Sequence, residues 1–559
     1  MSTENVVETD VLVIGGGLAG CFAAIKAKEQ GVDVVLVDKG YVSKSGETPF
    51  AGDTAVFNPE WGHNLDAWME QVNTIGEYIN NREWNEIVFR ESYARYQDLD
   101  KWGVKFLKQN GEPRRFPHPL KNLGLPDTNK FPPLVSECVH WRADFPKVLR
   151  KQAVKSGVRI MDRIMVTELI KQEGRIVGAI GIPMESYDLC IFRAKATVIA
   201  AGGGGFRPLG YPTHELTADG HAMAYRAGAE ITGKEFVSPS CTRPDYPGWP
   251  PFYIVFTHRP SAALRGGYKP PTRLINAEGD EVPCRGLAWH GWLDAHYEAH
   301  AGRAPVFSID PGGRKVIRGG SGAYGGMHGH ATDGICPINT NCATNIPGLY
   351  AAGDSLGTVF VGAAYSGFGF ATAYASVTGA RAGVAAAEYA QLAKNPRLDE
   401  EGLGRLKKIV YAPLERKGGF SPRWVTNVLR NILMPYFIMY IKHGERMRAA
   451  LTLVEFLNEH IVPKLTATDA HELRLAQETK NMVLNAEMKL RASIFRTESR
   501  GNHYREDYPH RDDPTWLAWV ILKEEQGTMK ALKRPIPQEW WPDLSQPYPV
   551  RYPLRFPGE

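Results

Sequence analysis

Paired cysteines of the kind that hold metal clusters are absent from this sequence. It has seven cysteines, and no two of them form a Cys-x-x-Cys motif. A built-in iron–sulfur cluster or zinc site is therefore not expected, and we predict no metal ligands. An odd, scattered set of cysteines is typical of reduced thiols, which indicates a cytoplasmic protein.

Long apolar runs and tracts of one charge are also missing. The longest apolar run, Ile432–Ile441, contains Pro435 and falls well short of the roughly 20 residues that a spanning helix needs, so we expect a buried helix and no transmembrane segment. Residues Met1–Asp10 are polar and acidic, unlike a secretion signal. The 66 basic and 61 acidic residues nearly balance, without a Lys/Arg run, which argues against a nucleic-acid partner.

The N-terminal segment has the pattern of a dinucleotide-binding βαβ unit. An apolar strand, Asp10–Ile14, leads into a Gly-x-Gly-x-x-Gly turn and an Ala-rich helix, and Asp38 ends the next strand. The glycines permit a tight turn, close approach of the backbone to a pyrophosphate, and close helix–strand packing. The helix N-terminus favours binding of phosphate. The Asp38 carboxylate can accept hydrogen bonds from the ribose hydroxyls, and it would repel a ribose phosphate, which argues against NADP. The glycines of the turn are Gly15, Gly17 and Gly20.

A later strand and the carboxylate at its end favour FAD over NAD as the dinucleotide. The strand Ala196–Ala201 runs into Gly202–Gly205, and the strand Leu349–Asp354 ends in a carboxylate that can accept hydrogen bonds from ribityl hydroxyls. The glycine-rich stretch Gly362–Gly369 then opens a second Ala-rich helix, whose N-terminus could stabilise a reduced, anionic flavin. Strands of this kind, far apart in the sequence, indicate one discontinuous FAD-binding domain.

The remaining composition suggests how the domains are arranged. The length allows roughly two to four domains. We predict an α/β fold with a three-layer, Rossmann-like FAD-binding domain, an inserted α+β cap domain rich in Gly, Pro and aromatic residues, and a C-terminal helical domain. We expect the Pro- and aromatic-rich tail to be an ordered, extended arm. The predicted boundaries are 1–234 and 326–395 for the FAD-binding domain, 235–325 for the cap, 396–533 for the helical domain and 534–559 for the tail.

Several segments resemble the flavoprotein subunits of the fumarate reductase/succinate dehydrogenase superfamily, and within it most of all the alpha subunits of adenylylsulfate reductases. The resemblance implies an FAD-dependent oxidoreductase that exchanges electrons with a ferredoxin-like iron–sulfur subunit, consistent with a chain that has no cluster motif of its own. The similar segments are Val6–Gly20, Ser43–Gly46, Ala196–Gly204, Ile346–Asp354, Tyr411–Arg416, Asp469–Glu478 and Phe495–Trp516.

Departures from the succinate and fumarate enzymes bear on the flavin linkage and the substrate. The segment in which those enzymes carry a flavin-linked histidine reads Lys44–Thr48 here, without histidine, so the resemblance implies non-covalent FAD. Their His-Pro-Thr-Gly segment is replaced by Ser238–Cys241, and their arginine falls near Tyr365 or Ser366. Without these groups a C4 dicarboxylate would lose charge-assisted hydrogen bonds, which disfavours succinate and fumarate.

Similarity to adenylylsulfate reductases suggests other site residues. A family histidine is matched by His328, an active-site asparagine by Asn58, and a substrate-channel arginine by either Arg243 or Arg265. A family glutamate is replaced by Arg142. The resemblance therefore favours a small anionic substrate, such as a sulfur oxyanion.

Four residues are candidates for catalysis. His328 and His330 lie in a glycine-rich segment before the strand Leu349–Asp354, where a histidine could act as a general acid or bind an oxyanion. Arg265 lies in a flexible turn of the cap and could bind an anion, and the hydroxyl of Tyr365 could face the substrate at the start of the second Ala-rich helix.

The charged residues of Arg496–Asp507 suggest a structural lock between domains. The candidate cofactor residues are Gly15, Gly17, Gly20, Asp38, Lys39, Ser45, Gly46, Asn58, Gly202, Gly203, Asp219, Gly353, Asp354, Gly367 and Gly369.

Three functions remain open from the sequence. The first is an adenylylsulfate-reductase-like enzyme acting on a small anion. The second is a dehydrogenase or ene-reductase of an organic acid, like the fumarate and succinate enzymes. The third is a flavin-binding electron-transfer subunit without substrate chemistry of its own.

Overall fold

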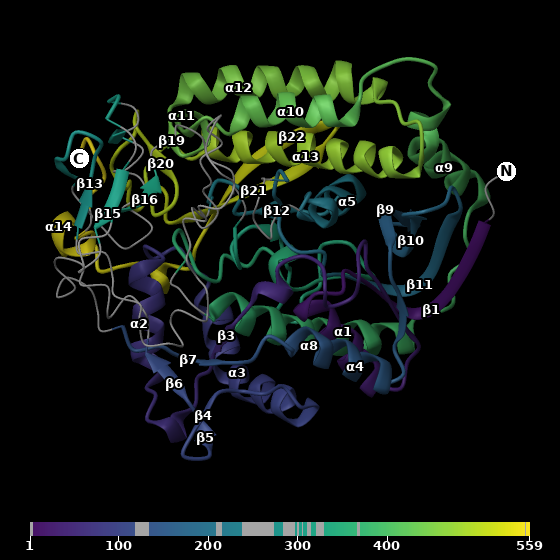
Figure 1. Cartoon of the computed structure of the whole chain (residues 1–559), viewed down its shortest axis with the longest axis horizontal. Coiled ribbons are helices and arrows are strands. Elements are labelled where there is room, and N and C mark those ends of the chain that lie inside the picture. Colours follow the sequence, from purple (N-terminus) through teal and green to yellow (C-terminus); the bar gives the residue numbers. More distant parts are fainter. Residues whose placement is uncertain are drawn as a thin grey trace.

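The core of the molecule is a seven-stranded sheet (Figure 1). The computed structural model describes residues 4–117, 134–207, 215–237, 273–282, 297–298, 301–303, 306–309, 315–319, 329–365, 369–553 and 555–559. The strands of the sheet run in the order β8-β2-β1-β11-β10-β9, and β18 also pairs with β11. The strands β8, β2, β1, β11 and β18 are parallel, whereas β9, β10 and β11 form an antiparallel meander. The bounds are β1 Glu4–Ile14, β2 Val34–Val37, β8 Arg159–Met161, β9 Ile164–Gln172, β10 Arg175–Pro183, β11 Leu189–Ile199 and β18 Leu349–Ala351.

Two Ala-rich helices, α1 (Leu18–Glu29) and α8 (Phe370–Leu392), pack closely against each other beside this sheet. Both are buried over most of their lengths, as expected of helices without a wide polar face. Glycines permit the close approach, because a Cβ at Gly379 would lie 2.4 Å from the carbonyl oxygen of Ala19 and one at Gly383 would lie 2.2 Å from that of Ala23. Helix α4 (Phe145–Lys155) packs on α1, and α5 (Asp219–Ala227) contacts β9.

A smaller antiparallel sheet is formed by strands that fall between β2 and β8 in the sequence. It has the order β3-β7-β6, with bounds Asp53–Ala55, Glu137–His140 and Arg115–Pro117. Helices α2 (Leu65–Ile75) and α3 (Arg82–Trp102) lie close by in Figure 1, and the side chains of Asn64 and Asn81 cap their N-termini.

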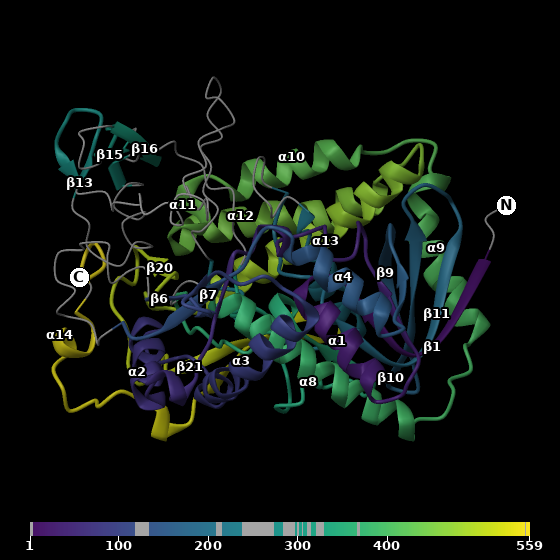
Figure 2. The ribbon, with the colours of Figure 1, turned by 60° about the horizontal axis from the view of Figure 1, so that its bottom comes forward.

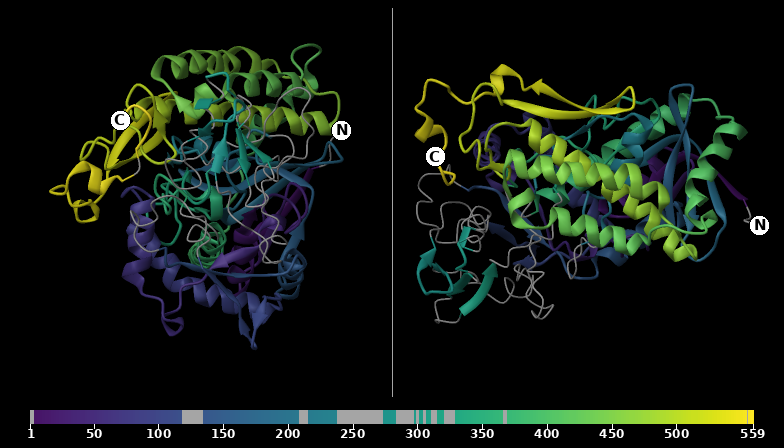
Figure 3. Two further views of the ribbon diagram at one scale, coloured as in Figure 1. Left: turned by 60° about the vertical axis from the view of Figure 1, so that its left-hand side comes forward. Right: turned by 90° about the horizontal axis from the view of Figure 1, so that it is seen from above.

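The C-terminal third of the chain is a helical layer followed by a long hairpin (Figures 2 and 3). Helices α10, α12 and α13 pack on one another, and α13 also contacts α5, which joins this layer to the FAD-binding fold. The hairpin strands β21 and β22 extend a sheet of order β17-β12-β21-β22, so this region is not purely helical. The bounds are α9 Glu400–Glu415, α10 Pro422–Leu433, α11 Tyr436–Met439, α12 Gly444–Phe456, α13 Ala470–Phe495, β12 Ile231–Thr232, β17 Gly334–Ile335, β21 Ala518–Glu525 and β22 Thr528–Pro535.

The cap and the tail lie at the same end of the molecule (Figure 1). The described part of the cap includes a four-stranded antiparallel sheet of order β14-β13-β15-β16, with bounds Glu281–Val282, Arg273–Ile275, Val306–Ile309 and Lys315–Gly319. The tail includes helix α14 (Tyr548–Arg551), and Tyr552 is buried against the chain. Two short parallel strands, β19 (Ile441–Lys442) and β20 (Tyr504–Arg505), join the helical layer to the segment that follows it.

The predicted fold class is confirmed: a mixed α/β flavin-type domain is followed by a region rich in helices. The strand predicted at Leu349–Asp354 is shorter. Helix α12 continues beyond Phe456 as a π-helix, Leu457–Ile461, and a 3-10 helix, Val462–Lys464. The domain boundaries remain predictions. Within the described residues, no helix combines the length and the apolar character needed to span a membrane.

Candidate flavin site

A cleft of about 310 Å³ opens where several strands and two helices meet. The residues that follow β1, β2, β11 and β18 line it, so it lies at the carboxyl ends of parallel strands, where α/β sheets bind ligands. The first turns of α1 and α8 also line it, through Leu18, Ala19, Ala371 and Thr372. The positive ends of two helix dipoles therefore face one cleft, which favours an anionic ligand.

The glycine-rich turn takes the shape that the sequence predicts. Gly15 has a φ of +102°, and a Cβ there would lie 2.3 Å from the carbonyl oxygen of Ala200, so only glycine fits. A Cβ at Gly20 would lie 1.8 Å from the carbonyl oxygen of Gly15, which explains the close helix–strand packing. Gly17 begins α1 without a side-chain cap. The turn therefore presents backbone to the cleft, as a diphosphate requires.

Asp38 holds this turn together. Its carboxylate accepts hydrogen bonds from the backbone N–H groups of Gly16 and Gly40, both at 2.7 Å. Burial raises the pKa of Asp38, and the two hydrogen bonds oppose that rise. The carboxylate can thus organise the loop at the same place where the sequence predicts contact with a ribose.

Lys39 and Asp219 bind each other. The ammonium of Lys39 lies 2.8 Å from the Asp219 carboxylate and 2.9 Å from that of Glu478, on α13. The other Asp219 oxygen accepts a hydrogen bond from Asn481, also on α13, at 2.8 Å. Lys39 and Asp219 both line the cleft. Their contacts with Glu478 and Asn481 also connect the helical layer to the FAD-binding fold.

The far end of the cleft contains the predicted residues Asp354, His330 and Tyr365. The Asp354 carboxylate lies 2.9 Å from Nδ1 of His330 and accepts a hydrogen bond from the N–H of Ala331 at 2.9 Å. The Tyr365 hydroxyl accepts a hydrogen bond from the N–H of Ala371, in the first turn of α8, at 3.0 Å. Burial raises the pKa of Tyr365, so its hydroxyl stays protonated.

The structure brings most of the predicted site residues to this cleft. Those that line it are Gly15, Gly17, Asp38, Lys39, Ser45, Gly46, Gly202, Asp219, His330, Gly353, Asp354, Tyr365 and Gly369. Gly20 and Gly203 are buried beside it, and Asn58 caps a short helix by accepting a hydrogen bond from the N–H of Glu60. His328, Arg265, Arg243 and Gly367 lie outside the described residues. Roles in cofactor binding and catalysis remain predictions for all of them.

The cleft also contains polar residues that the sequence did not predict, among them Thr48 and Asp53. The Thr48 hydroxyl accepts a hydrogen bond from the N–H of Leu18 at 2.9 Å, and so supports the start of α1. Asp53 also lines the cleft, and burial raises its pKa to about 7. No motif marks either residue, because their positions depend on how the segment after Gly46 folds back over the turn.

A buried polar network lies behind the far end of the cleft. Nε2 of His221 is 3.2 Å from the carbonyl oxygen of Asp354, and its Nδ1 is 2.8 Å from the ammonium of Lys234. Lys234 is also paired with Asp333 at 2.9 Å, and Asp333 with Lys489 at 3.3 Å. Burial and the charge of Lys234 lower the pKa of His221 to about 3, so its imidazole is neutral and accepts from the lysine.

Known proteins match both ends of the chain. The FAD binding domain family matches residues 10–244, and the fumarate reductase flavoprotein C-terminal family matches residues 427–548. A protein of Methanothermobacter marburgensis named as a subunit of fumarate reductase (CoM/CoB) is 27% identical over 93% of this chain and 98% of its own. An L-aspartate oxidase of Saccharolobus solfataricus is 24% identical over 90% and 97%.

Solved structures share the fold over nearly the whole chain. The flavoprotein FrdA of E. coli quinol fumarate reductase superposes with a TM-score of 0.78 at 18% identity, covering 96% of this chain and 97% of that one. Adenylylsulfate reductase from Archaeoglobus fulgidus superposes with a TM-score of 0.73 at 21% identity, with the same coverage.

The glycine turn, the two helix starts and the strand-end carboxylates fit an FAD molecule, and the family matches agree with this geometry. Over nearly its whole length the chain is similar to flavoprotein subunits of the fumarate reductase/succinate dehydrogenase superfamily, and it is an FAD-dependent oxidoreductase.

Proposed function

We propose that this chain is the flavoprotein subunit of an enzyme that moves two electrons between non-covalently bound FAD and a small anionic substrate. A ferredoxin-like iron–sulfur subunit exchanges electrons with the same flavin one at a time. The observation that carries the proposal is the cleft that begins at the start of α1 and ends at Asp354, His330 and Tyr365. When bound, FAD supplies both the two-electron and the one-electron chemistry.

The chain's own residues supply orientation and a proton path. An ionised Asp354 carboxylate can only accept hydrogen bonds, so it keeps a proton on Nδ1 of His330 and leaves Nε2 as the acceptor. His330 can then take or deliver a proton at Nε2. The start of α8 provides partial positive charge for a reduced flavin or an anionic substrate. His328, as a general acid or oxyanion-binding group, and Arg265, as an anion-binding group, belong to the proposal as catalytic candidates.

The first substrate class is a sulfur oxyanion or a related small anion. Its support is the likeness of Tyr411–Arg416, Asp469–Glu478 and Phe495–Trp516 to adenylylsulfate reductases, together with the replacement of the groups by which dicarboxylate enzymes hold their substrates. Tyr365 stands near the position of their arginine, and a neutral phenol cannot form the ion pair that a carboxylate would need.

The second substrate class is an unsaturated organic acid. Its support is the 27% identity to a protein named as part of a fumarate reductase over almost the full length of both chains.

In either case we expect His328→Ala to lower kcat by about 100-fold or more if His328 is the general acid. Full turnover by that variant would remove the assignment.

One anaerobic experiment separates the possibilities. Purified protein reconstituted with FAD is first titrated with sulfite and then, in a separate assay with a reduced dye, offered fumarate and other enoates. Bleaching of the flavin absorbance by sulfite supports the sulfur-oxyanion class, and dye oxidation supports the enoate class. A protein that binds FAD but responds to neither would favour an electron-transfer subunit without substrate chemistry and contradict the proposal.

A further inference from the structure

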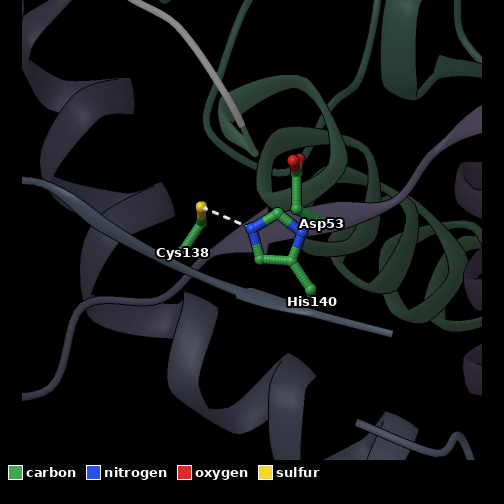
Figure 4. A group of neighbouring side chains, drawn as sticks. All are labelled: Asp53, Cys138 and His140. Carbon is green, nitrogen blue, oxygen red and sulfur yellow. Dashed lines mark hydrogen bonds between the residues drawn. The ribbon is translucent and has the colours of Figure 1, made fainter. Parts of the chain in front are cut away.

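Three side chains with metal-binding chemistry meet on one face of the small sheet (Figure 4). In the antiparallel pairing of β3 with β7, Asp53 lies opposite His140 and Ala55 lies opposite Cys138. Cys138 and His140 are two residues apart on one strand, so their side chains share a face, and the cross-strand partner Asp53 shares that face too. One ligand atom of each residue lies within 4.8 Å of the ligand atoms of the other two.

From this geometry we infer that Asp53, Cys138 and His140 bind a divalent transition-metal ion of the zinc type. A thiolate, an imidazole and a carboxylate are all ligands that Zn²⁺ accepts. The Cys138 Sγ to His140 Nε2 distance is 3.7 Å. Zn–S and Zn–N bonds of about 2.3 and 2.0 Å at a tetrahedral angle would set these atoms about 3.5 Å apart, so little movement is needed.

The charges of the site balance. Metal binding releases the Cys138 thiol proton to solvent, and the resulting thiolate and the Asp53 carboxylate together neutralise a divalent ion. A neutral His140 adds no charge, and a neutral site avoids the cost of burying a net charge.

The surroundings support a ligand rather than a filled hydrogen-bond network. Cys138 is 4% exposed, and the Phe116 ring lies 4.1 Å from the His140 ring and shields it. Nδ1 of His140 is buried and has no hydrogen-bond partner in the described part of the chain, so among the described residues only the Cys138 thiol, at Nε2, forms a hydrogen bond with this ring. The guanidinium of Arg114 lies over the Phe116 ring, 4.7 Å from its centroid.

The site adjoins the flavin cleft. Asp53 lines that cleft, whereas Cys138 and His140 stand behind it on β7. Three protein ligands leave one position of a tetrahedral ion open, as catalytic zinc sites do. We place that position on the cleft side, where water or an oxygen atom of a substrate can bind the ion. The existence of the metal site does not depend on which substrate the enzyme uses.

The test uses the full-length protein with bound FAD. It is stripped with a chelator and titrated with Co²⁺ as the probe, and the d–d bands are read at wavelengths longer than oxidised flavin absorbs. We expect one equivalent of tightly bound Co²⁺ with the intense bands of tetrahedral, thiolate-bound cobalt, displaced by Zn²⁺. Metal analysis of protein that has not been stripped gives a second measurement.

Cys138→Ser and His140→Ala should each weaken Co²⁺ binding by about 100-fold or more. Loss of a residue that only supports a metal ligand can already cost about 100-fold, and these residues are ligands themselves. Cys190→Ser and His460→Ala are matched controls, since the first residue is buried on β11 and the second is exposed on the helical layer. FAD content and the thermal unfolding midpoint show whether each variant is folded. Absence of tight Co²⁺ binding to the wild type, or equal binding by a folded Cys138→Ser protein, would overturn the inference.

Discussion

Asp38 shows how one side chain can set the shape of a binding loop. Its two carboxylate oxygens each accept one backbone N–H, from Gly16 and from Gly40, and so fix the turn on both sides of the strand end. The same carboxylate lines the cleft. A change at this residue should therefore affect the cofactor more than it affects the global fold.

Asp38→Asn should weaken FAD binding about tenfold or more. An amide has one acceptor oxygen, so one of the two N–H groups would face an NH₂ group and lose its partner, at a cost of about 1–3 kcal/mol. Fluorescence titration of the stripped protein with FAD measures the change. Asp33→Asn is the control, because the Asp33 side chain is 81% exposed and lies away from the cleft; equal affinities for the two variants would contradict this role for Asp38.

Two buried histidines make stability depend on pH. Nδ1 of His221 lies 2.8 Å from the Lys234 ammonium, and Nδ1 of His503 lies 2.8 Å from that of Lys442, so both rings must be neutral to accept. Burial and the neighbouring lysine lower the pKa of His221 from 6.5 to about 3, and the same causes lower that of His503 well below its usual value.

A histidine whose pKa is lower in the folded than in the unfolded protein stabilises the fold at pH values above its unfolded pKa. That stabilisation is lost as the pH falls toward the folded pKa. Below pH 6.5 we expect the free energy of unfolding to drop by about 1.4 kcal/mol per pH unit for each of these histidines. Urea unfolding from neutral pH to about pH 5 measures the slope. His221→Gln should reduce the slope by about half, whereas His460→Gln, at an exposed site, should leave it unchanged. A flat profile in the wild type would rule out the effect.

At the scale of elements, the crossing of α1 and α8 places both helix starts at the cleft. The two backbones approach so closely there that two positions accept only glycine. A larger residue would push the helices apart, and the two N-termini would no longer face one ligand.

Gly379→Ala should destabilise the protein by about 1–3 kcal/mol or more and reduce FAD content, because its Cβ would lie 2.4 Å from the carbonyl oxygen of Ala19. Gly404→Ala is the same substitution within α9, where a Cβ would have nothing within 4 Å. Helix propensity should make that variant more stable by about 0.5–1 kcal/mol. Thermal and urea unfolding compare the two, and similar stabilities would refute the packing argument.

At the scale of the whole molecule, buried ion pairs and hydrogen bonds join the C-terminal segment to Glu77 and Glu235, in the first half of the chain. Arg500 donates to the carbonyl oxygen of Glu77 at 2.8 Å, Arg511 pairs with the Glu77 carboxylate at 2.6 Å, and Arg496 pairs with Glu235 at 3.0 Å. The tail joins this lock, because the Tyr552 hydroxyl lies 2.9 Å from Arg500. The predicted structural role of Arg496–Asp507 agrees with these contacts.

Glu498→Gln should lower the free energy of unfolding by about 1.5–3 kcal/mol or more, because Glu498 pairs with both Arg496 and Arg500 at fully buried positions. Without it each arginine keeps one carboxylate partner, Glu235 for Arg496 and Asp513 for Arg500. Glu401→Gln breaks an exposed pair with Arg405 on α9 and should change stability by about 0.5 kcal/mol or less. Urea unfolding at neutral pH measures both. Equal effects would mean that the buried network does not hold the domains together.

The sequence alone determined the glycine turn, the helices that follow the strands and the carboxylates at the strand ends. These features depend on local rules: a positive φ demands glycine, apolar strands precede helices in a βαβ unit, and a residue that follows a strand lies at the edge of the sheet. Gly15, Asp38 and Asp354 could therefore be assigned to one cleft from local patterns.

Only the tertiary structure decided what depends on contacts between distant segments. Lys39 and Asp219 pair with each other and with α13, and no local pattern in the sequence encodes that contact. Asp53 joins Cys138 and His140 through the register of β3 on β7, which no spacing rule for metal ligands contains, so the sequence predicted no metal site. Register is set by the pleat and by packing of the whole sheet, and a shift of one residue would turn these side chains to opposite faces.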